Sequence, residues 1–139
     1  MLIMTIDTKI VFVAVHVLCM LGAFGGVLIV QCGLPKTVRD TADVARAAGR
    51  LPTMLFAIGF LAGLITYWLK IRYAANSNVQ LPTIEHSIVG IKFLFLVAAG
   101  AFMGITAKAL KQGETGRANF FRGMTLIPLV LAACLGLLL

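Results

Sequence analysis

The run IVFVAVHVLCMLGAFGGVLIV, residues 10–30, is apolar throughout except for the imidazole of His16 and the thiol of Cys19. A helix of 21 residues is about 32 Å long, which matches a hydrocarbon core of about 30 Å. The run lacks the period-2 alternation of a membrane barrel strand. It therefore predicts a transmembrane helix that carries its own polar group.

Three further apolar runs follow the first, and together the four predict one all-α membrane protein. The predicted helices cover about residues 10–30, 51–69, 88–107 and 120–139, with a short cytoplasmic surface helix over 38–48. The hydrophobic fraction is 60% and the charged fraction 12%, outside the range of soluble domains. The connections are too short for a soluble domain, so residues 1–139 form a single four-transmembrane-helix bundle in a lipid bilayer.

The positive charge has a topological explanation. Eight cations lie in the first and third connections (Lys36, Arg39, Arg46, Arg50, Lys108, Lys111, Arg117 and Arg122), against three on the opposite side (Lys9, Lys70 and Arg72). By the positive-inside rule both termini are non-cytoplasmic. We therefore predict a multi-pass protein of the bacterial inner (cytoplasmic) membrane, and the net charge of +7 gives no reason to expect nucleic acid as a partner.

Pairs of glycines four residues apart occur in the first three predicted helices. They are Gly22/Gly26, Gly59/Gly63 and Gly100/Gly104. Small residues at this spacing let helix backbones approach closely in a membrane. Three readings stay open, namely packing within the chain, a homo-oligomer through the glycine faces, and room for a flat ligand such as a porphyrin.

Two basic side chains are predicted at similar depth inside the membrane. His16 lies six residues into the first helix, and Lys92 lies four residues into the third, which enters from the same side. A charge in hydrocarbon is costly, so Lys92 is expected to face the interior or to extend outward to the interface. His86 is either an interfacial residue or an axial ligand facing His16 across a haem, since imidazole is a common iron ligand.

A second constellation on the first helix suits copper. His16, Cys19 and Met20 stand at i, i+3 and i+4, so they share one face. Imidazole, thiol and thioether together would bind Cu(I), although the same residues would also pack as an ordinary core. The predicted helices hold no carboxylate, which argues against a proton-coupled exporter.

Read as a whole, the chain resembles the small four-helix membrane proteins of the HemJ-type protoporphyrinogen oxidase and CopD-type copper-resistance group. The likeness rests on short motifs, which are Val15-His16-Val17-Leu18 followed by Gly25-Gly26, Arg50 before a helix ending in Gly63-Leu64, Gly90-Ile91-Lys92-Phe93-Leu94, and Phe120-Phe121-Arg122 followed by Ile127-Pro128. The chain departs from the HemJ-type pattern at Gly90, where that family has a histidine, and at Leu126, where it has an acidic residue.

The resemblance implies a shared fold and a b-type haem held by His16, and leaves open whether the chain is an oxidoreductase. In this reading His86 is a second ligand, and Lys92 and Arg50, at opposite membrane ends, are candidates for the porphyrin propionates. A quinone or another membrane redox protein would be the electron partner. The alternatives are a non-catalytic membrane subunit packed through its glycine faces and a copper-handling protein.

Overall fold

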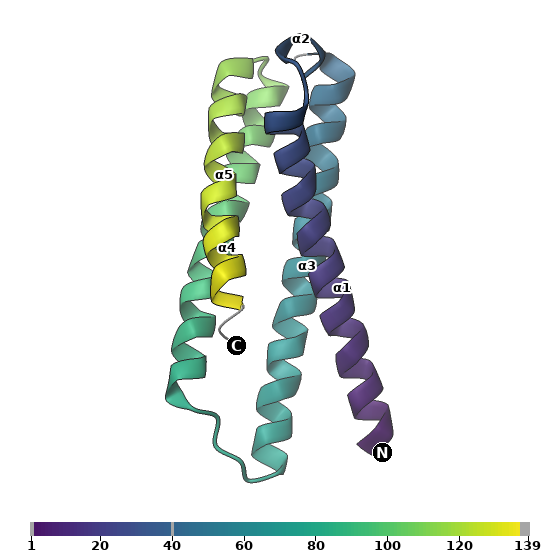
Figure 1. Cartoon of the computed structure of the whole chain (residues 1–139), viewed down its shortest axis with the longest axis vertical. Coiled ribbons are helices and arrows are strands. Elements are labelled where there is room, and N and C mark those ends of the chain that lie inside the picture. The colour runs from purple at the N-terminus through teal and green to yellow at the C-terminus, as the bar shows by residue number, and fades with distance from the viewer. Residues whose placement is uncertain (1, 40, 137–139) are drawn as a thin grey trace.

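The protein is all-helical over residues 2–39 and 41–136, the part that the computed structural model describes (Figure 1). The elements are α1 (Leu2–Leu28), the π-helical turn η1 (Ile29–Gly33), α2 (Lys36–Arg39), α3 (Ala42–Asn76), α4 (Thr83–Lys111) and α5 (Thr115–Gly136). Four segments within these helices are long and apolar enough to cross a membrane, namely Thr8–Gly33, Gly49–Asn76, Thr83–Lys111 and Thr115–Gly136. The predicted all-α architecture with four spans is confirmed.

The outer surface of the bundle is apolar. Large aliphatic side chains such as Leu18, Leu94 and Ile10 are 60% or more exposed, and they belong to three-turn stretches without charge. A soluble protein rarely exposes such continuous apolar surface, whereas in a bilayer it contacts acyl chains. This chain is a multi-pass membrane protein.

The helices associate as two closely packed pairs. α1 lies along α3 and α4 lies along α5, while fewer contacts join the two pairs, through α3 with α4 and α1 with α5 (Figure 1). The short α2 sits at one end of the bundle, here called the α2 end. The interior between the pairs is filled by a core of small and medium side chains, including Ala23, Val27, Ala99 and Met103.

Glycine shapes the contact between α1 and α3. A Cβ added at Gly26 would lie 3.0 Å from Cγ of Pro52, and one at Gly22 would lie 2.9 Å from Cδ1 of Leu55. The glycines of α3 receive side chains of α1 in the same way. Five of the six glycines in these pairs therefore serve packing within the chain, including Gly100 against Phe56 of α3, whereas Gly104 has open space beside it.

The first connection differs from the expected surface helix over 38–48. The helix there is split between α2, which ends at Arg39, and α3, which begins at Ala42 and runs on through Pro52. Proline has no N–H and usually breaks a helix interior. Here the Thr53 hydroxyl donates to the carbonyl of Gly49 at 2.7 Å, and the Pro52 ring is packed against Gly26. These contacts hold the helix together across the proline.

Candidate functional site

His16 is held in one orientation by α3. Its ring lies against Gly63, where an added Cβ would be 2.7 Å from Nδ1, and Nδ1 lies 2.6 Å from the carbonyl oxygen of Gly59. A carbonyl oxygen only accepts hydrogen bonds, so Nδ1 must carry the proton and donate it. In this tautomer the lone pair is on Nε2, for which the described residues offer no hydrogen-bond partner.

A cavity of about 540 Å³ lies beside His16, between α1, α4 and α5. His16 and Met20 line it from α1, Lys92 and Leu96 from α4, and Ala132 and Cys134 from α5. Its walls are mainly apolar, and its volume falls in the range of about 300–1,000 Å³ that is usual for small-molecule sites. The cavity lies in the half of the bundle away from α2.

Lys92 is half-buried and points toward the end of α5. Its Nζ lies 3.0 Å from the position of a Cβ added at Gly136, in the last turn of that helix. Lys92 and His16, which the sequence places at similar depth, therefore line the same cavity from different helices.

His86 lies outside this cavity. It is exposed, in the first turn of α4, and its Nδ1 forms a hydrogen bond with the Tyr67 hydroxyl of α3. One residue earlier, Glu85 forms an ion pair with Lys70 of α3. These two contacts join α3 to α4 near the 77–82 connection. The structure does not bring His86 to His16, so His86 is not placed to be a second axial ligand across the cavity.

Arg50 and Cys19 are also not brought to the cavity. Arg50 is exposed on α3 at the α2 end, the far end of the bundle. Cys19 faces α3, because its Cβ would lie 3.0 Å from a Cβ added at Gly59. Met20 Cγ would lie 3.2 Å from the same Cβ position, and His16 bonds to the Gly59 carbonyl, so all three residues of the expected copper set contact α3, while only His16 and Met20 also line the cavity. Across the described chain, no three His, Cys, Asp or Glu residues gather closely enough to hold a metal ion.

The donor set suits a porphyrin better than a metal ion held by the protein alone. His16 offers one nitrogen ligand, with Nδ1 bound to a backbone carbonyl as is usual for metal-ligating histidines. A haem brings four nitrogen ligands of its own and needs a protein ligand only on its axis. The residues present therefore fit a b-type haem with His16 on one face.

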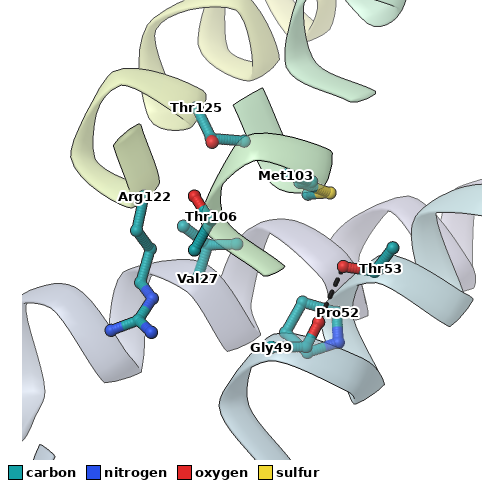
Figure 2. A pocket seen from close by; sticks show the side chains of 8 residues that line it. All are labelled: Val27, Gly49, Pro52, Thr53, Met103, Thr106, Arg122 and Thr125. Atoms are coloured by element: carbon teal, nitrogen blue, oxygen red, sulfur yellow. Dashed lines mark hydrogen bonds between the residues drawn. The ribbon is translucent and has the colours of Figure 1, made fainter. Parts of the chain in front are cut away.

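The sequence reasoning missed a buried polar cluster near the α2 end. Arg122, taken as a loop cation, lies in α5 and is 3% exposed, with Thr106 and Thr125 also buried (Figure 2). Its Nη1 donates to Oδ1 of Asn119 at 3.1 Å. Spacing could have revealed it, since the buried residues Ala118, Arg122, Thr125, Leu129 and Ala132 follow steps of four and three residues along α5.

This cluster borders a second cavity of only about 10 Å³. Such a volume holds about one water molecule. Both threonine hydroxyls donate to carbonyls of their own helices, Thr106 to Phe102 and Thr125 to Phe121. The cluster is therefore a site of polar packing, and the larger cavity beside His16 is the candidate ligand site.

Comparisons with protein families, with curated proteins and with solved structures find no match to this chain.

Proposed function

We propose that this protein binds a haem or a closely related porphyrin in the cavity between α1, α4 and α5, with Nε2 of His16 as the axial ligand. The observation that carries the proposal is the hydrogen bond from Nδ1 of His16 to the Gly59 carbonyl, because it leaves Nε2 as the ligating atom beside a cavity of about 540 Å³. A bound haem would supply one-electron chemistry, with a quinone or a membrane redox protein as the partner class.

Lys92 supplies the charge complement to a porphyrin. Haem carries two propionate groups, and an ammonium group within an apolar cavity is a strong partner for a carboxylate. Lys92 lines the cavity with its Nζ beside the end of α5, where a propionate could reach it. Arg50 is removed from this role, since it lies at the opposite end of the bundle.

The charge distribution supports one orientation in the bacterial inner membrane. Eight of the twelve Lys and Arg residues belong to residues 34–50 and 108–122, the two segments at the α2 end, together with three of the five acidic residues. Since cationic connections favour the cytoplasm, the α2 end is cytoplasmic and both termini are on the other side. The cavity then belongs to the non-cytoplasmic half.

A second candidate function is the handling of Cu(I). The observation that favours it is that Met20 and Cys134 line the cavity together with His16. Thioether, thiol and imidazole are the ligands that Cu(I) prefers. The set expected from α1 alone, His16, Cys19 and Met20, shares two of these three residues.

One spectroscopic experiment tests the haem proposal against the alternative. The full chain is purified in detergent, titrated with hemin and followed by its Soret band. We expect a red complex in the wild type, an affinity at least about tenfold weaker in His16→Ala, and no change in His86→Ala, the matched control outside the cavity. A wild type that binds no hemin, or His16→Ala with wild-type affinity and spectrum, would overturn the proposal.

The copper candidate gives a different pattern in the same variants. It predicts one Cu(I) per chain that is lost in Met20→Leu and in Cys134→Ser as well as in His16→Ala. A colourless protein without copper that co-purifies with a fixed partner would instead favour the membrane-subunit alternative.

A further inference from the structure

The cavity beside His16 is incompletely walled between α1 and α5. Val17 and Leu21 of α1 and Val130 of α5 line the cavity, and the same side chains are 46%, 62% and 44% exposed. Side chains that line a cavity and stay this exposed belong to a side that no further layer of side chains covers. We call this place, formed by Val17, Leu21, Val130 and Ala133, the α1–α5 opening.

Close packing bounds the cavity on other sides. α1 is pressed against α3 by glycine contacts, and α4 lies along the length of α5. Toward the α2 end the interior is filled by buried core residues, among them Ala23, Ala99 and Met103. The seam between α1 and α5 has far fewer contacts than either close pair, so the wall can part there more easily than within a close pair.

The chemistry of the opening decides what crosses it. All four of its side chains are aliphatic, and they lie within the spans Thr8–Gly33 and Thr115–Gly136. Acyl chains, and not water, therefore cover this part of the surface. The two nitrogen groups of the cavity, on His16 and Lys92, line the same space as these aliphatic side chains.

We propose that the ligand enters sideways from the bilayer through the α1–α5 opening, as a membrane-dissolved amphiphile with a carboxylate that comes to rest at Lys92. This inference rests on the proposed function, because it takes a porphyrin as the occupant of the cavity. It adds the source of the ligand, which is the lipid phase, and it names the residues that control the rate of uptake.

The test measures uptake rates of the full chain in proteoliposomes. Hemin-loaded liposomes are mixed with the protein, and the Soret change gives the rate constant, while a long incubation gives the bound fraction at equilibrium. Ala133→Trp narrows the opening and should slow uptake about tenfold with little change in the bound fraction. Leu21→Ala widens it and should speed uptake. Leu61→Trp is the matched control, because Leu61 of α3 is 59% exposed and does not line the cavity.

The outcomes separate the route from the binding function. Opposite changes in the uptake rates of the two opening variants, with an unchanged control, support sideways entry. The uptake rate should then depend on the hemin-to-lipid ratio and not on the hemin concentration in water. Unchanged rates in both variants with normal equilibrium binding overturn the route alone. If Ala133→Trp no longer binds hemin at equilibrium, the Leu21→Ala variant decides: faster hemin uptake supports the route, and an unchanged rate overturns it. No binding by the wild type overturns the proposed function itself.

Discussion

Gly63→Ala perturbs the orientation of His16 without replacing any residue that lines the cavity. The added Cβ would lie 2.7 Å from Nδ1 and 2.8 Å from Cε1 of the imidazole, closer than real Cβ atoms come to other heavy atoms. Either the ring turns away or α1 and α3 separate. In both cases the hydrogen bond from Nδ1 to the Gly59 carbonyl is strained or lost. The variant therefore tests whether α3 prepares His16 as a ligand.

The expected magnitudes differ for stability and for binding. Overpacking of a tight contact costs about 1–3 kcal/mol, and replacing glycine by alanine in a helix returns about 0.8–1.0 kcal/mol. The net loss of stability is therefore small, about 0–2 kcal/mol, since the imidazole can yield by turning. Loss of the group that orients a metal-ligating histidine commonly lowers affinity about 10–100-fold, which is about 1.4–2.8 kcal/mol of binding energy.

The assay is a hemin titration by Soret absorbance, accompanied by thermal unfolding in the same detergent. The matched control is Gly104→Ala, because that glycine lies in a spanning helix with nothing within 4 Å of an added Cβ. We expect weaker hemin binding in Gly63→Ala only. Equal affinity in the wild type, Gly63→Ala and Gly104→Ala would refute the argument that the α3 contact prepares the ligand.

Three other substitutions probe separate contacts. Lys92→Met should weaken the binding of hemin about tenfold and leave the binding of hemin dimethyl ester unchanged, since a hydrogen bond to a charged group contributes about 1.5–3 kcal/mol. Titration with the two porphyrins measures both affinities, and an equal loss for both would argue against a propionate at Lys92. Tyr67→Phe removes the hydrogen bond to His86 and should lower thermal stability by about 1 kcal/mol with an unaltered hemin spectrum; a shifted Soret band would show that His86 does act on the cavity. Thr125 is 0% exposed, so Thr125→Leu should destabilise the bundle by about 1–3 kcal/mol in thermal unfolding, whereas Thr125→Val, of similar size, should cost less; equal losses would mean that the hydroxyl and not the packing matters.

Hydropathy predicted the spans well because the cost of placing polar groups in hydrocarbon depends on local composition. It did not predict how far the helices continue. α1 begins at Leu2 and α3 at Ala42, beyond the apolar runs, because polar residues can extend a helix outside the hydrocarbon layer. Arg122 was counted with the cations of the third connection, at the start of the helix predicted over 120–139, although α5 starts seven residues before it and buries it.

The depth of a residue in the membrane could be predicted from the sequence, but the direction in which its side chain points around the helix axis could not. The helical rise placed His16 and Lys92 at one level, and the structure brings both to one cavity. Hydropathy does not fix the rotation of a helix about its axis, so it could not be predicted that the cavity lining includes Cys134 and not Cys19. The hydrogen bond between His86 and Tyr67 depends on the same rotation, since it needs α4 turned toward α3.

The position of the cavity follows from how the four helices pair. The glycine contacts make α1 and α3 one rigid unit, which holds the imidazole of His16 at a fixed angle. Lys92 belongs to the other unit, formed by α4 and α5, and its ammonium group lies against the end of α5. A ligand held by both groups would join the two units across their weakest seam, so binding should stabilise the whole bundle, by about 2.7 kcal/mol at a ligand concentration 100 times Kd. The loose seam that admits the ligand is then the one that the ligand closes.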